Sequence, residues 1–188
     1  MGTAEVQVRQ SNVMQTTLLL VIAAESVLFG TLVMSYLFLR GGGSSMHFPH
    51  PKPLDLLIAG SNTLILLTSA ALARRARQAI TRDHVRSLVR NLLLALGLGA
   101  IFIAGQVFEF RHAGMQVGDL AFGGVFFALI SFHAVHVLAG MTVLSLNLVR
   151  AQLGDFNRNR HTAITGGAWF WYYVTAIWIV LFTVLYLV

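Results

Sequence analysis

The chain has 188 residues, of which 56% are hydrophobic and only 11% are charged. Its mean hydropathy of +0.74 lies outside the usual range of soluble domains, and its apolar residues fall in blocks long enough to cross a bilayer as helices. The formal net charge of +6 sits between these blocks, which favours an orientation signal over nucleic-acid binding. Because cysteine is absent, the chain has no disulfide, iron–sulfur cluster or thiolate copper site of its own.

Five apolar blocks predict an all-α, polytopic membrane bundle with five transmembrane helices. The first block is too long for the core of a cleavable signal peptide, so we expect it to remain in the mature protein. The fourth is longer than a bilayer requires and is expected to tilt or to project into water. We expect a cytoplasmic segment at 1–16, followed by a single transmembrane domain at 17–188 with spans at about 17–39, 54–73, 92–110, 120–149 and 164–188.

The distribution of cations predicts the orientation of these spans, because Lys and Arg near span ends tend to stay cytoplasmic. Six arginines lie between the second and third spans, from Arg74 to Arg90. Arg9, Arg150, Arg158 and Arg160 fall on the same side, whereas Arg40, Lys52 and Arg111 fall on the other. The N-terminus is therefore expected inside and the C-terminus outside.

Glu25 lies inside the first apolar block, where an ionisable group costs roughly 2.5 to 3.5 kcal/mol on insertion scales. Such a group usually faces protein, and it is expected to be neutral or paired. A single structural hydrogen bond would explain it, but a functional or lipid-contacting role is favoured.

His133 and His136 are three residues apart on the fourth span and share a helical face. One helix cannot supply both axial ligands of a haem, so we expect no metal here, and both rings should hydrogen-bond between helices or to a lipid head group. Counting residues from each membrane edge puts Glu25 and His133 in the same inner half of the bilayer. We therefore predict that these two residues share one polar pocket.

Two further features mark span ends. Glu109 ends the third span within GQVFEFRH, where a solvated helix end and a specific contact to water, a loop cation or a partner are about equally expected. The stretch WFWYYVTAIW is typical of a membrane interface or a packed helix junction, and Gly99 and Gly140 are among the small residues that permit close helix approach. The packing aromatics are expected to be Trp169, Trp171, Tyr172 and Trp178.

The residues contain no recognisable catalytic centre: no Ser-His-Asp set, phosphate loop or paired-carboxylate site stands in a suitable context. Buried polar groups without cofactor ligands indicate a partner within a complex rather than a free-standing enzyme. A different class remains open, an independent proton-coupled transporter that uses Glu25 and His133 as a relay, although paired broken helices are missing.

At these residues the chain resembles subunit III of the haem-copper respiratory oxidases, the cytochrome c or quinol oxidases. Its five spans are similar to the short bacterial members, which lack two extra N-terminal helices. The stretches that carry the resemblance are AAESVLFGTLVMSYLF, SNTLILLTSAAL, GQVFEF, SFHAVHVLAGMTVL and GGAWFWYYVTAIWIVLFTVLYLV.

The resemblance implies an accessory subunit of a proton-pumping terminal oxidase in the bacterial plasma or inner membrane, bound mainly to catalytic subunit I. Haem and copper are then expected in the partner subunits, with no cofactor in this chain. Subunit III holds phospholipid, helps to preserve turnover and lies near the proton entry route. Glu25 matches the family's carbodiimide-reactive carboxylate, and His133, His136 and Glu109 match its polar positions.

One departure and one alternative accompany this resemblance. Many relatives read W-H-F-V-D in the last helix, where this chain has a Tyr at 172 and a Thr at 175, so roles that rest on that His and Asp are in doubt. The accessory membrane subunit of a nitric oxide reductase is the alternative within the same superfamily.

Overall fold

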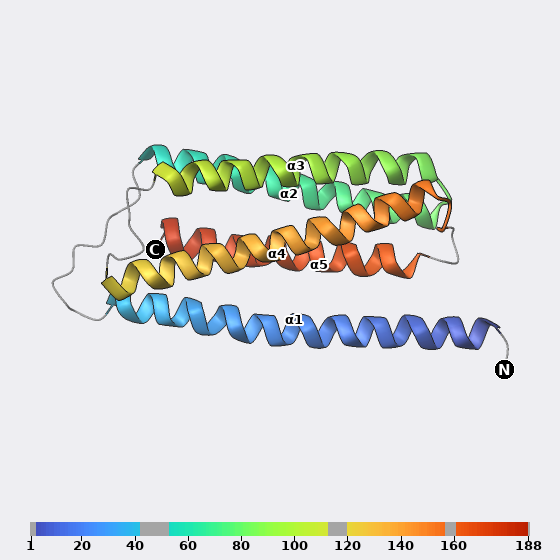
Figure 1. The fold of residues 1–188 in the computed structure, drawn as a ribbon, viewed down its shortest axis with the longest axis horizontal. Helices are drawn as coiled ribbons and strands as arrows, with labels where there is room; N and C mark the ends of the chain where they lie inside the picture. Colours follow the sequence, from blue (N-terminus) through green and yellow to red (C-terminus); the bar gives the residue numbers. More distant parts are fainter. Residues whose placement is uncertain (1–2, 42–52, 113–119, 157–160, 188) are drawn as a thin grey trace.

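The computed structural model describes residues 3–41, 53–112, 120–156 and 161–187. These residues form five long helices, drawn in Figure 1. All five are long and apolar enough to cross a membrane, which confirms the all-α prediction of five spans. Their bounds are Thr3–Gly41 (α1), Pro53–Thr81 (α2), Val85–His112 (α3), Leu120–Gln152 (α4) and Thr162–Phe182 (α5), followed by a π-helical turn at Thr183–Leu187 (η1).

The helices extend beyond the apolar blocks that predicted them. α2 continues through its three arginines to Thr81, and α3 begins at Val85, well before the expected residue 92. Arginine is a good helix former and can place its charged end in water while its stem lies along the helix. The backbone hydrogen bonds therefore continue beyond the residues at which hydropathy predicts the end of the span.

The ends of the helices separate into two groups (Figure 1). The start of α1, the α2–α3 turn and the end of α4 lie at one end of the bundle, and the end of α1 and the starts of α2 and α4 lie at the other. The arginine-rich segments thus gather at the first end, as the orientation argument requires. Which end faces the cytoplasm remains a prediction.

Both arginine-rich helix ends close with the same hydrogen-bonding pattern. After α2, the backbone amide of His84 donates to Ala79 O at 2.9 Å and that of Asp83 donates to Ile80 O at 3.0 Å. This is a Schellman motif with Asp83 in the left-handed conformation at φ 61°. Gly154 has the equivalent place after α4, at φ 82°. The α2–α3 connection is consequently tight, and these two helices make the most extensive pairing in the bundle.

Two buried tryptophans fasten α5 to α2. Trp171 and Trp178 are both 0% exposed. Trp171 Nε1 donates to Ser69 Oγ at 3.1 Å, and Ser69 Oγ donates in turn to the Ala95 carbonyl of α3 at 2.8 Å. Trp178 Nε1 donates to Thr63 Oγ1 at 2.9 Å. The indole N–H groups are thereby satisfied within the membrane, where an unpaired donor is costly.

Glycines make room for the Trp171 ring. A Cβ at Gly140 would lie 2.8 Å from the ring, and one at Gly99 would lie 3.2 Å from it. Because real Cβ atoms do not approach so closely at Gly140, a larger residue there would displace the indole. Both glycines had been predicted to permit close helix approach, and the structure confirms that they do.

α1 lies along the outside of the bundle, next to α4 and α5 (Figure 1). Within its most apolar stretch only 6% of residues are buried, against 28–39% in the other four helices. Phe29 and Tyr36 are its buried apolar residues among those described, whereas Val27 and Phe38 are more than 70% exposed. Most of the α1 surface is therefore available to lipid or to another chain.

Candidate functional site

Glu25 of α1 and His136 of α4 make a polar contact near the middle of both spans. Glu25 Oε2 lies 3.0 Å from His136 Nε2. Oε2 is buried and has no other hydrogen-bond partner among the described residues. The Glu25 side chain as a whole is 31% exposed and that of His136 is 13% exposed. The carboxyl group is thus sheltered on one side and open on the other.

The other ring nitrogen of His136, Nδ1, indicates which nitrogen of the ring carries a hydrogen. Nδ1 lies 2.7 Å from the Phe132 carbonyl oxygen. A carbonyl can only accept, so Nδ1 must carry a hydrogen. Nε2 in the neutral ring is then a bare acceptor facing a carboxyl oxygen. The contact is favourable only when one further proton lies between them, on Glu25 or on His136.

Aromatic residues surround the pair. The ring of Phe29 meets His136 edge-on at a centroid distance of 5.1 Å. Tyr173 of α5 lies near Ser26, the residue after Glu25, and its hydroxyl has no hydrogen-bond partner among the described residues. The surroundings are therefore mainly apolar, which makes a shared proton more favourable than two separated charges.

His133 occupies a different environment from the one expected. It is 1% exposed, and neither ring nitrogen has a hydrogen-bond partner among the described residues. The ring stacks on Trp178 at 5.2 Å and meets Phe102 edge-on at 6.1 Å. The structure therefore pairs Glu25 with His136 rather than with His133, and His133 packs into the core where α3, α4 and α5 meet.

Glu109 is held within the chain at the opposite end of the bundle. Its Oε1 accepts from the Tyr186 hydroxyl at 2.7 Å, and its Oε2 accepts from Gln106 Nε2 at 3.4 Å. Tyr186 belongs to the π-helical turn η1, so this carboxylate connects the end of α3 to the end of the last span. Glu109 is half-buried and lies far along the bundle from the Glu25 pair.

The aromatic residues of α5 divide into two groups. Trp171 and Trp178 belong to the core, whereas Trp169 and Tyr172 are half-buried. At the position where many relatives have Asp, Thr175 is buried and its hydroxyl donates to the Trp171 carbonyl at 2.9 Å. Its hydroxyl is therefore used within its own helix.

Sequence reasoning missed several polar residues at helix contacts. Asn62 packs against Gly105 so closely that a Cβ there would clash with its amide group. Gln106 and Tyr186 both contact Glu109. Gln106 is three residues from Glu109 on a helix, so that contact was detectable from spacing. In the part of the chain that the structure describes, no cluster of three or more His, Cys, Asp or Glu could hold a metal ion.

Comparison with known proteins decides the family. The family model for cytochrome c oxidase subunit III matches residues 5–188. The chain belongs to the cytochrome c oxidase subunit III family. It is 33% identical to cytochrome c oxidase subunit 3 of Thermostichus vulcanus over 90% of this chain and 85% of that protein. It is 31% identical to the subunit 3 of Synechocystis sp., over 89% of this chain and 72% of that protein.

A third relative has a similar coverage. The chain is 29% identical to a probable cytochrome c oxidase subunit 3 of Nocardia farcinica, over 89% of this chain and 84% of that protein. With five apolar helices covering the matched residues, this chain is a five-helix, short-form subunit III and a multi-pass protein of the cell membrane. Membership of this family implies that its partners are the other subunits of the oxidase complex.

Proposed function

We propose that this subunit III is an accessory chain that stabilises catalytic subunit I, holds lipid and supports proton uptake while the complex reduces oxygen to water. Haem and copper belong to the partner subunits in this proposal. The observation that carries it is the Glu25–His136 pair, a proton-sharing contact at mid-membrane on the most exposed helix of the bundle.

The lipid-holding role is supported by the exposure of α1 around the pair. The Glu25 side chain is 31% exposed, and its neighbours on the same helical face, Val21 and Leu28, are 43% and 37% exposed. A lipid chain that lies along this face would cover the open side of the carboxyl group and exclude water from it. Burial of the pair would then depend on bound lipid as well as on protein.

The proton-related role is supported by the tautomer of His136. Because its Nδ1 hydrogen is engaged with Phe132, the pair retains one proton between Nε2 and Oε2. The pair is thus a candidate proton-holding site at the bundle surface. We also propose that the arginine-rich end of the bundle is cytoplasmic.

Glu25→Gln tests this proposal in the assembled oxidase. The amide keeps the size of the side chain but cannot share an acidic proton. We expect the initial rate of oxygen reduction to stay within about twofold of the unmodified complex and the activity to decline sooner during sustained turnover. Oxygen consumption followed to inactivation measures both quantities, and the haem and copper content of the same sample should be unchanged.

Asp155→Asn is the matched control. Asp155 pairs with Arg150 at 3.2 Å, but both side chains are about half exposed at a helix end. Removing this carboxylate should leave both rate and lifetime as they were. If Glu25→Gln behaves like Asp155→Asn, the supporting role of the pair is wrong. Proton flux through the purified chain alone would favour the transporter alternative.

A further inference from the structure

A basic groove lies between the end of α2 and the start of α3, at the arginine-rich end of the bundle and away from the Glu25 pair. It has a volume of about 330 Å³. This size is within the range of small-ligand sites. Its arginines are Arg75 of α2, Arg82 of the α2–α3 turn and Arg90 of α3, and His84 of the turn also lines it. The other lining residues are Gln78, Ala79, Ser87 and Asn91.

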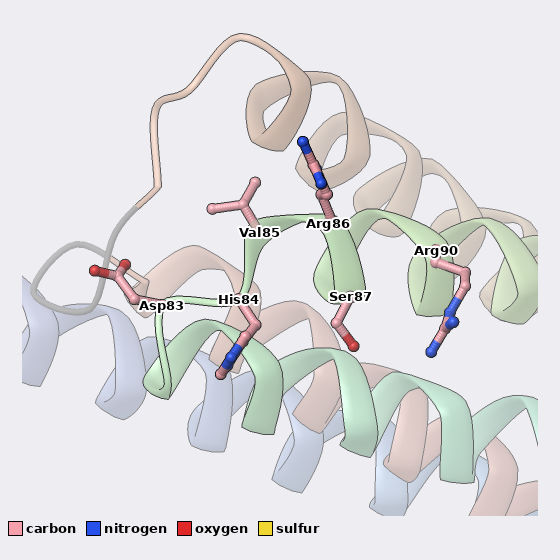
Figure 2. Close-up of a pocket in the computed structure, with 6 residues that line it drawn as sticks. All are labelled: Asp83, His84, Val85, Arg86, Ser87 and Arg90. Atoms are coloured by element: carbon pink, nitrogen blue, oxygen red, sulfur yellow. The ribbon is translucent and has the colours of Figure 1, made fainter.

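The side chains of this groove converge because of helical spacing. His84, Ser87 and Arg90 are three residues apart in succession, so they lie along one face. Figure 2 shows all three extending toward α2, whereas Val85 and Arg86 extend to the other side. The groove therefore brings together the side chains of His84, Ser87 and Arg90. They lie opposite α2, which contributes Arg75.

No acidic side chain lines this groove among the residues that the structure describes. Among the described residues, neither Arg75, Arg82 nor Arg90 forms an ion pair. Asp83 is the nearest carboxylate along the chain, but it lines the adjoining hollow rather than this groove. The first turn of α3 also has no acidic residue to complement the positive end of the helix. The groove therefore combines a positive electrostatic potential with several hydrogen-bond donors.

Counted along the helices, the groove lies at the level where lipid head groups are expected. Arg75 precedes the end of its span at Thr81 by six residues, which is about 9 Å along the axis, and Arg90 lies about 7.5 Å inside the start of the next span. Both side chains are exposed. Long arginine side chains at this depth reach the head-group layer, and guanidinium groups bind phosphate oxygens in pairs.

We propose that this groove binds the head group of an anionic phospholipid, with the phosphate held between Arg75 and Arg90 and the acyl chains running along α2 and α3. This deepens the lipid-holding part of the proposed function by naming the lipid class and a place distinct from the Glu25 pair. Charge complementarity selects the occupant, since basic pockets between transmembrane helices suit anionic head groups.

Lipid retention by the purified oxidase complex tests this proposal. The complex is stripped with detergent, titrated with a phosphatidylglycerol or with phosphatidylcholine, and examined by native mass spectrometry. We expect one phosphatidylglycerol to be retained on the unmodified complex in preference to phosphatidylcholine. In Arg75→Gln/Arg90→Gln its retention should be about 30-fold weaker, as removal of two interfacial arginines implies.

The matched control is Arg74→Gln/Arg86→Gln, which removes the same charge from the same two helix ends but outside the groove. It should retain phosphatidylglycerol normally, and Arg75→Lys/Arg90→Lys should recover part of the lost binding. Equal weakening in both glutamine pairs would show a general surface charge effect and overturn the site. Displacement by millimolar inorganic phosphate alone, or cross-linking of the groove to an acidic segment of another subunit, would also overturn it.

Failure of this site and failure of the proposed function are separable. The retained phosphatidylglycerol is counted on the intact complex, whereas the Glu25→Gln experiment measures the decline of oxygen reduction. A complex that keeps its Glu25-dependent lifetime but shows no groove-dependent lipid would overturn only the lipid site. A complex with the lipid but no effect of Glu25→Gln would overturn only the supporting role of the pair.

Discussion

Helices α2, α3 and α5 pack around two buried tryptophans, whereas α1 rests against α4 and α5 with most of its surface turned outward. The first region combines close packing with satisfied indole donors. The second relies on a few apolar contacts and on the Glu25–His136 pair. We infer from this difference that the tryptophan region stabilises the fold and that α1 provides a surface for lipid and partner subunits.

Removing the Trp171 ring should cause the largest loss of stability among the changes that test this comparison. Trp171→Ala would leave a cavity beside Gly99 and Gly140 and would remove the hydrogen bond that Ser69 Oγ accepts from the indole. We expect it to lower the free energy of unfolding by about 3–5 kcal/mol. Unfolding of the purified chain in mixed micelles measures the loss. Trp169→Ala, at a half-buried position on the same helix, is the control, and an equal loss there would contradict a tryptophan-centred core.

An added methyl group at Gly105 should have an intermediate effect. Its Cβ would clash with the Asn62 amide, so Gly105→Ala should destabilise the α2–α3 pair by about 1–3 kcal/mol. Gly97→Ala is the matched control, because nothing lies within 4 Å of a Cβ there and the helix gains propensity. Adding Asn62→Ala to Gly105→Ala should restore most of the stability. The same unfolding measurement tests all three variants.

Loss of the α1–α4 pair should have the smallest effect on stability. His136→Ala removes one interhelical contact, and such contacts contribute about 0.6–1.7 kcal/mol within membranes. We expect the tryptophan region to unfold nearly as before, while cross-links between α1 and α4 form more slowly. A loss as large as that of Trp171→Ala would show that the two regions fold as one unit.

The sequence predicts the helices well because each is an apolar block of membrane length, but it predicts their ends poorly. Hydropathy falls at Arg74, yet the α2 backbone stays helical to Thr81. Helical hydrogen bonding does not depend on the polarity of the side chain. The apolar block therefore marks the hydrocarbon core, and the turn chemistry at Asp83 marks the true end of α2.

The rotation of each helix about its axis could not be predicted from the sequence. Counting residues predicted that Glu25 shares a pocket with His133, whereas the structure pairs it with His136 on the same helix. His133 and His136 differ by only about 60° around the helix axis, so sequence could not choose between them. The stack of His133 on Trp178 turns His136 toward α1. The partner of Glu109 was likewise hidden, because Tyr186 reaches it from the π-helical turn.

The order of synthesis gives the Glu25–His136 contact a further consequence. α1 enters the bilayer before α4, and the histidine that receives its carboxyl group follows about 110 residues later, which takes roughly 5–20 s at about 5–20 residues per second. During that interval Glu25 has no partner from α4 or α5. The nascent first span must therefore wait with its carboxyl group protonated, or be shielded by the insertion machinery, until the fourth span arrives.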